Sequence, residues 1–131
     1  MGTQALIGIY EGGQLRTAVV NYDGYTKHTG KILLEHYKTP EEVRKIIDAG
    51  EIRAFQEDGS FTTYDDKAET AVYPPCSWEE LYRDYFSVIV QREDVREYTY
   101  IFNAEDGKWY IGRGNARCLG ELTQELIDMD Y

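Results

Sequence analysis

The sequence predicts an α+β fold, in which an antiparallel sheet built from hairpins carries three to four short helices on one face. Two observations lead to this prediction. Glycine-containing turns join short apolar or alternating segments near both ends of the chain, which is typical of β-hairpins. Between them lie short segments that begin with helix-capping residues, without the regular strand-helix alternation of a parallel sheet. The length of 131 residues fits a single domain over residues 1–131.

The first hairpin is predicted from residues 3–10 and 14–22, which Gly12 and Gly13 join. Both faces of its second strand are partly apolar, so we expect this hairpin near the centre of the sheet. Residues 30–37 are then expected to form a short helix, because apolar side chains recur at a spacing of four.

The second helix has the clearest start. Thr39, Pro40 and Glu42 form the pattern of a capping box with proline at the first helical position, and Gly50 is a typical end. Asp58 and Gly59 then predict the turn of another hairpin.

Ser77, with Glu80 three residues later, predicts a third helix. Its inward-facing side chains are expected to be Leu81, Tyr82, Tyr85 and Phe86. A closing hairpin is predicted from residues 95–103 and 109–111, and a last helix from about residues 121–129.

The formal net charge of −10 is unevenly distributed along the chain. Residues 1–31 carry two acidic and three basic side chains, whereas residues 32–131 carry 22 acidic and 11 basic ones, a balance of −11. Such a field repels phosphate and attracts basic surfaces, so we expect a basic protein partner and no direct binding of nucleic acid. Acidity that only keeps a protein soluble is the alternative explanation.

No stretch approaches the ~18 apolar residues of a membrane span, and the start of the chain lacks the basic residues of a signal peptide. We therefore expect a cytoplasmic protein with no membrane partner. Cys76 and Cys118 are far apart and are expected to be reduced thiols. Histidines and cysteines are few, and the paired carboxylates lack the spacing of a calcium loop, so no metal or cofactor is expected.

Three side chains could carry catalysis: His28, His36 and Cys76. A histidine base needs a nucleophile and an orienting acid, which Asp23 or Glu35 could supply. Cys76 precedes a predicted helix, whose dipole would favour a thiolate. The sequence brings none of these groups together, so we assign no catalytic residue, and a small enzyme using the three side chains is kept as an alternative.

A small-ligand site is a further alternative. Residues 112–117 are the most basic part of the last third of the chain, although they lack the pattern of a phosphate-binding loop. Cationic and aromatic side chains from this loop and from residues 22–31 could together hold a nucleotide signal. The predicted ligand-binding residues are Tyr25, His28, Lys31, Arg113 and Arg117, with Tyr22 beside them.

The chain has 12 tyrosines, more than a core of this size needs, and tyrosine is enriched at protein interfaces. Those that could converge on one sheet face are Tyr22, Tyr25, Tyr37, Tyr98, Tyr100 and Tyr110. An aromatic core with its hydroxyls at the rim is the alternative. The predicted partner-binding residues combine tyrosines with carboxylates: Tyr22, Asp23, Tyr25, Asp65, Asp66, Glu79 and Glu80.

Residues 4–47 contain an Ile-Gly strand, a glycine turn, the stretch Asn21-Tyr22-Asp23-Gly24-Tyr25 and a helix that ends near Tyr37. This pattern resembles a group of small, mostly uncharacterised proteins of phages and mobile elements, and the closing hairpin is similar too. The group usually has His and Trp where this chain has Asn21 and Tyr22. The resemblance carries no known activity, and it implies a phage or mobile-element origin.

The leading interpretation is a non-enzymatic acidic protein that binds and inhibits a basic host defence protein. Carboxylates would stand where nucleic-acid phosphates lie, as in an anti-CRISPR protein that acts as a DNA mimic. Sequestration of a small nucleotide signal and a small enzyme are the alternatives. The oligomeric state and the identity of the partner are left open by the sequence.

Overall fold

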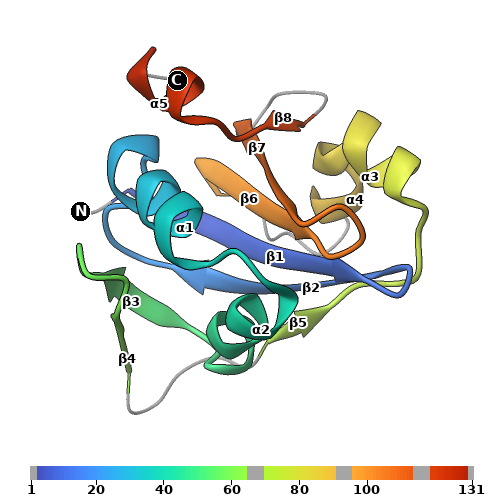
Figure 1. Cartoon of the computed structure of the whole chain (residues 1–131). Coiled ribbons are helices and arrows are strands. Elements are labelled where there is room, and N and C mark those ends of the chain that lie inside the picture. Colours follow the sequence, from blue (N-terminus) through green and yellow to red (C-terminus); the bar gives the residue numbers. More distant parts are fainter. Residues whose placement is uncertain (1–2, 65–69, 91–95, 114–118, 130–131) are drawn as a thin grey trace.

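An N-terminal hairpin, β1 (Ala5–Glu11) and β2 (Gln14–Val20), lies at the centre of the sheet (Figure 1), as predicted. Its turn contains Gly12 and Gly13, both with the positive φ that glycine adopts without strain. The computed structural model describes residues 3–64, 70–90, 96–113 and 119–129 of the chain. The other strands are β3 (Ile52–Phe55), β4 (Phe61–Thr63), β5 (Ala71–Val72), β6 (Tyr98–Asn103), β7 (Lys108–Arg113) and β8 (Gly120–Glu121).

The α+β class is confirmed, but the sheet is mixed rather than purely antiparallel. Its order is β4-β3-β2-β1-β6-β7-β8, with β5 also paired to β2. The predicted hairpins β1–β2, β3–β4 and β6–β7 are antiparallel, whereas β1–β6 and β2–β3 are parallel. A parallel pair needs a long crossover. The helices and loops between residues 21 and 97 provide it for β1 and β6, and no local sequence signal reports such a pairing.

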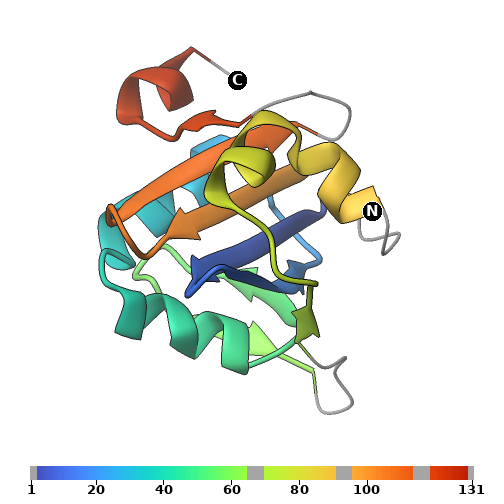
Figure 2. The same ribbon diagram turned by 90° about the vertical axis from the view of Figure 1, so that its right-hand side faces the viewer.

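Helices cover both faces of the sheet, so the prediction of one covered face is wrong. One face carries the π-turn η1 (Thr26–Gly30) and the helices α1 (Lys31–His36), α2 (Pro40–Asp48) and α5 (Gln124–Asp128). The opposite face carries α3 (Trp78–Arg83) and α4 (Tyr85–Val90), as Figure 2 shows. The strands explain this arrangement. In β1, Ile7 and Ile9 face the first group of helices while Leu6 and Tyr10 face the second, so both sides need cover.

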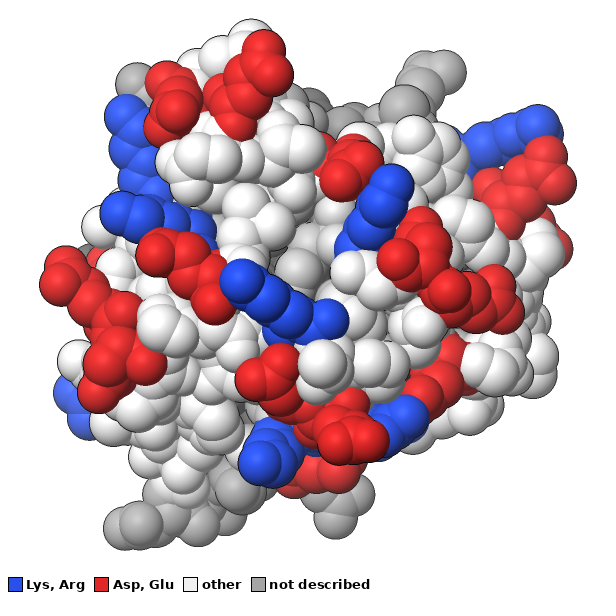
Figure 3. Space-filling view, in the orientation of Figure 1, with Lys and Arg blue, Asp and Glu red and all other residues white. Residues whose placement is uncertain are grey.

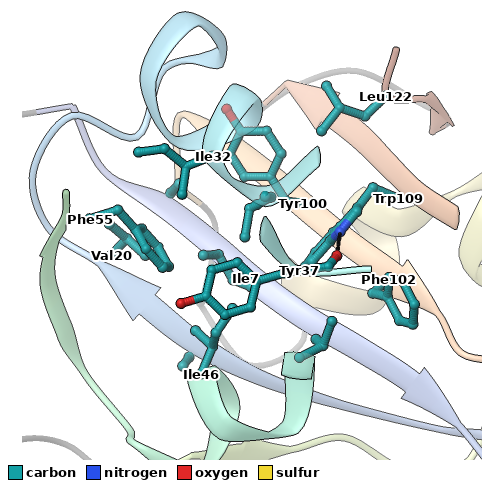
Figure 4. Packing of buried hydrophobic residues seen from close by; sticks show 14 of the residues in the cluster. Ile7, Val20, Ile32, Tyr37, Ile46, Phe55, Tyr100, Phe102, Trp109 and Leu122 are labelled. Carbon is teal, nitrogen blue, oxygen red and sulfur yellow. Dashed lines mark hydrogen bonds between the residues drawn. The ribbon is translucent and has the colours of Figure 1, made fainter. Parts of the chain in front are cut away.

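The larger core lies between the sheet and the helices α1, α2 and α5 (Figure 4). Trp109 of β7 is buried there, and its indole Nε1–H donates to the Tyr37 carbonyl at 2.8 Å. Tyr100 of β6 is also buried, and its hydroxyl donates to the Gly24 carbonyl at 2.6 Å. This second bond, with the close packing of Gly30 on the Tyr100 ring, fixes the segment that follows β2 against the sheet.

The helix starts predicted from capping residues are confirmed for α2 and α3. The last helix begins later than the predicted residue 121, because Gly120 and Glu121 form β8 and Thr123 caps α5. Thr39 and Glu42 form the reciprocal capping box of α2, with Pro40 at the first position. Ser77 accepts from the Glu80 backbone N–H at the start of α3. The second half of the predicted third helix is a separate helix, α4, because the helical conformation is interrupted at Asp84.

The break changes which side chains point inward. The Asp84 carboxylate accepts from the backbone N–H and hydroxyl of Ser87, which gives α4 its own cap. Leu81 and Tyr85 are buried as expected, but Tyr82 is exposed. The side chain of Phe86 lies outside the described residues. In the part of the chain that the structure describes, every helix is too short or too polar to cross a bilayer.

Candidate functional site

Three of the predicted ligand-binding residues come together beside η1. The Tyr25 and His28 rings lie 6.1 Å apart, and His28 Nε2 is 2.8 Å from the Phe55 carbonyl at the end of β3. His28 and Lys31 line a hollow of about 250 Å³ at the junction of η1, α1 and the β3–β4 turn. Its other lining residues are Lys27, Ile32, Glu35 and Glu57. Lys27 was considered from the sequence as a further cationic donor, whereas Ile32, Glu35 and Glu57 were not predicted as ligand residues.

The charges of this hollow are mixed. Two lysines and two glutamates line it, so its walls are nearly neutral when His28 is neutral. Because a carbonyl can only accept, His28 donates from Nε2 to Phe55, and Nδ1 is the ring nitrogen that remains for a ligand. In the described part of the chain, no group of three metal-ligating side chains gathers here or elsewhere.

The remaining predicted ligand residues do not join this hollow. The Arg113 guanidinium lies over the ring of Tyr98, 4.3 Å from its centroid, at the end of β7. Arg113 is not among the residues that line the hollow. Arg117 lies outside the described residues.

The predicted partner-binding residues are separated by the sheet. Tyr22 and Tyr25 are 42% and 41% exposed, and they lie in the loop between β2 and η1. Asp23, between them, is exposed and has a left-handed φ of 57°. Glu79 and Glu80 are on α3, which covers the opposite face. Asp65 and Asp66 lie outside the described residues.

The six tyrosines that were expected to share one face do not. Tyr37, Tyr98 and Tyr100 are buried in the core under α1, so they belong to the alternative interpretation of an aromatic core. Tyr110 is on the other side of the sheet, packed with the α3 cluster.

The α3 side carries a cluster of four aromatic rings that no single sequence segment reveals. Trp78 stands at its centre, with ring centroids at 5.3 Å from Tyr10, 6.0 Å from Tyr82 and 4.9 Å from Tyr110. The rings of Tyr82 and Tyr110 meet edge to face at 5.7 Å. Tyr10 is buried, Trp78 and Tyr110 are half-buried, and Tyr82 is 37% exposed. We call these four residues the aromatic patch.

Carboxylates surround the aromatic patch. The Tyr110 hydroxyl donates to the Asp106 carboxylate at 2.5 Å. Burial raises the pKa of Tyr110, and this hydrogen bond and the charge of Glu121 raise it further. Burial also raises the pKa of Tyr10, and nearby negative charges, those of Glu105 and Glu80 among them, add to the effect. All four carboxylates belong to exposed residues, so the patch has an acidic rim at the surface: Glu80, Glu105, Asp106 and Glu121. One of these charges is partly offset, because the Lys108 ammonium lies 3.8 Å from the Glu121 carboxylate.

The candidate nucleophile does not meet a histidine in the described residues. Cys76 packs with the α3 cluster, whereas His28 bonds Phe55 and His36 packs on Gly59, both on the other side of the sheet. Burial raises the pKa of the Cys76 thiol, and the Glu80 carboxylate raises it further, which opposes thiolate formation.

None of the family models, curated proteins or solved structures compared with the chain matches it. The function must therefore be argued from the site itself. Of the aromatic patch and its rim, only Glu80 and Tyr110 were named from the sequence as candidates for a binding surface, and Tyr82 was expected to face the core. A sequence signal did exist, since Trp78 follows the cap of α3 and lies four residues from Tyr82 on one helix. Tyr10 joins the aromatic patch only through the position of β1 in the sheet, which the sequence alone does not give.

Proposed function

We propose that the protein is a non-enzymatic binder that docks on the basic surface of another protein through the aromatic patch. The observation that carries this proposal is a partly exposed group of three rings, Trp78, Tyr82 and Tyr110, bordered by four carboxylates. Aromatic anchors within a polar rim are the usual composition of a protein-binding hot spot. The acidic rim selects a partner of opposite charge.

The distribution of charge supports docking on the α3 side. Figure 3 shows the face with α1, α2 and α5, where basic and acidic side chains alternate. Such a mixed face has no large single-sign field. Two of its arginines are held in ion pairs, as Arg83 and Lys108 are on the α3 side. Arg16 lies 2.9 Å from Asp48, and Arg44 bonds Glu11.

The proposed biological role rests on the resemblance of residues 4–47 to proteins of phages and mobile elements. In that setting the partner is a host defence protein whose nucleic-acid groove is basic, and the binder acts as an inhibitor in the host cytoplasm. The overall charge of −10 supports this role because it repels nucleic acid and attracts such a groove. The acidic rim would then occupy positions that phosphates take.

A capture experiment with matched variants tests the proposal. Immobilised protein is exposed to a bacterial lysate at low and at moderate salt, and the captured proteins are identified by mass spectrometry. We compare Tyr82→Ala and Glu105→Lys with Tyr22→Ala and Glu125→Lys. The two controls change an equally exposed tyrosine and a glutamate of α5, away from the patch.

A basic protein that is lost at higher salt and in both patch variants, but kept in both controls, is the expected result. Capture that is the same in all four variants would show that the patch is not the docking surface. Capture of no basic protein at low salt would contradict the proposed function.

The hollow beside η1 favours a second candidate function, the binding of a small nucleotide signal. The supporting observation is that His28 and Lys31, two predicted ligand residues from separate turns, share one cavity with the Tyr25 ring beside it. A nucleoside monophosphate at saturating concentration should then raise the melting temperature. The rise should disappear in Lys31→Gln and persist in Lys45→Gln, which changes an exposed lysine of α2. Equal rises in both variants, or none in the unaltered protein, would remove this candidate.

A further inference from the structure

We infer that the partner contacts the aromatic patch with an arginine, whose guanidinium stacks on the exposed ring of Tyr82 while its N–H groups reach the acidic rim. This inference rests on the proposed function and adds the chemistry of recognition to it. A lysine at the same place would offer only a compact, strongly hydrated ammonium, without a planar group to stack on the ring.

The packing of the rings leaves part of the Tyr82 ring free to contact a cation. Tyr82 packs against Trp78 at an interplanar angle of 47° and against Tyr110 at 86°. In tilted and edge-to-face packing the rings do not cover one another completely, as they would in a stack. Tyr82 is 37% exposed, the largest exposed fraction recorded for a ring of this cluster. Its ring surface is therefore available to a cation, which is attracted to the negative face of an aromatic ring.

Electrostatics around the patch strengthens this attraction. The hydrogen bond from the Tyr110 hydroxyl to Asp106, at 2.5 Å, shifts electron density toward the Tyr110 ring. The charges of Glu105 and Glu80 both reach Tyr10, whose ring packs against Trp78 at 5.3 Å. A cation on the patch thus meets ring faces and carboxylates together.

Arginine suits this combination better than lysine. The guanidinium is planar and weakly hydrated, so it stacks on a ring and still directs its N–H groups sideways to carboxylates. An ammonium group is compact and strongly hydrated, and it loses more solvation when it lies on a ring. Among the described residues, arginine already contacts tyrosine rings in this way, with Arg113 over Tyr98 at 4.3 Å and Arg53 over Tyr22 at 5.9 Å.

The arginine next to Tyr82 in the chain does not fill this role. Arg83 forms an ion pair with Glu79, one turn earlier on α3, with 2.5 Å between its Nη2 and the Glu79 Oε1. This pair points along the helix surface, where both side chains are largely exposed.

Nuclear magnetic resonance with three short peptides tests the inference. The peptides share one alternating sequence of glycine and a second residue, which is arginine, lysine or the uncharged citrulline. The chain has two tryptophans, so the spectrum contains two indole N–H signals. Trp78 reports on the patch, and Trp109 is an internal control, because it is buried on the other face and bonded to Tyr37.

We expect the arginine peptide to shift the Trp78 signal and to leave the Trp109 signal in place. Its dissociation constant should be roughly three- to thirty-fold lower than that of the lysine peptide, as a cation–π contact of ordinary strength implies. The citrulline peptide should not bind. Tyr82→Ala should abolish the preference for arginine, whereas Tyr82→Phe, which keeps the ring, and Tyr22→Ala should retain it.

Two other outcomes would overturn the inference, and they are distinguishable. Equal affinity for the arginine and lysine peptides, reduced for both in Glu105→Gln, would leave the proposed docking on a basic surface standing and refute the arginine anchor. Absence of any Trp78 shift with all charged peptides would refute the patch as a site for cationic partners, and with it the proposed function.

Discussion

Trp109 Nε1 and the Tyr37 carbonyl lie 2.8 Å apart in the core, and they join the closing hairpin to the end of α1. The two residues are 72 positions apart in the chain. Figure 4 shows the bond in the middle of the packed side chains. It is one of the long-range contacts that hold the helices beside the candidate ligand hollow on the sheet.

Trp109→Phe should destabilise the protein by about 2–4 kcal/mol, because the smaller ring leaves a cavity and the Tyr37 carbonyl loses its donor. Urea unfolding followed by circular dichroism measures the loss. Met129→Ala is the control, since Met129 is 75% exposed and should change stability by less than about 0.5 kcal/mol. A similarly small loss in Trp109→Phe would mean that the bond contributes little.

Gly112→Ala should disturb the packing of α4. A Cβ atom at Gly112 would lie 2.4 Å from the ring of Tyr85, which is 1% exposed and cannot move away freely. We expect a loss of about 1–3 kcal/mol, typical of overpacking in a core. Gly120→Ala is the matched control in the neighbouring strand, because no atom lies within 4 Å of its added Cβ.

The double variant with Tyr85→Leu tests this mechanism directly. If the ring of Tyr85 is the obstacle, the combined loss should be smaller than the two separate losses added together. If the two losses of stability simply add, the Tyr85 ring is not the reason why Gly112→Ala destabilises the protein.

Thr39→Ala removes both the hydroxyl that accepts from the Glu42 N–H and one partner of the Glu42 carboxylate. The expected loss of stability is about 1 kcal/mol, the usual value for an N-cap. Thr39→Ser should restore most of it, since serine caps equally well. Equal stability of the alanine and serine variants would show that α2 is held by its buried face, Val43, Ile46 and Ile47, rather than by its cap.

Stability should fall above about pH 10, because burial raises the pKa of several tyrosines in the folded state and the unfolded value is near 10. A group whose pKa is raised on folding stabilises the protein at all pH values below its unfolded pKa. That contribution is lost as the pH rises toward the folded pKa. The tyrosines concerned are Tyr10, Tyr37, Tyr100 and Tyr110.

Urea unfolding between pH 8 and pH 11, together with absorbance of the tyrosinate, measures this dependence. Tyr110→Phe should weaken it, because phenylalanine carries no proton to lose. An unchanged free energy of unfolding up to pH 11 would contradict the prediction.

Local signals were sufficient for the three predicted hairpins and for the starts of α2 and α3. Gly12 and Gly13 need positive φ in a tight turn, and the threonine and serine caps act within three residues of themselves. The break at Asp84 was missed, because Leu81 and Tyr85 keep the spacing of a continuous helix while the Asp84 side chain caps a new one.

Contacts between distant segments could not be predicted in the same way. The patch joins Tyr10 to Trp78 only because β1 pairs with β2 and the chain before α3 bonds back to that hairpin, with the Cys76 N–H donating to the Gly13 carbonyl. The predicted acidic and tyrosine residues were grouped by composition, which carries no information about sheet face. Tyr25, beside η1, and Glu80, on α3, were therefore assigned to one surface although η1 and α3 cover opposite faces of the sheet.

The parallel pairing of β1 with β6 has a consequence for synthesis on the ribosome. Ala5 pairs with Tyr98, a separation of 93 residues, so one edge of β1 has no partner until most of the described chain has left the exit tunnel. The nascent hairpin presents an apolar, unpaired edge during that interval, and such edges promote misassembly. Slow decoding before β6 would prolong the interval in which this edge of β1 has no partner.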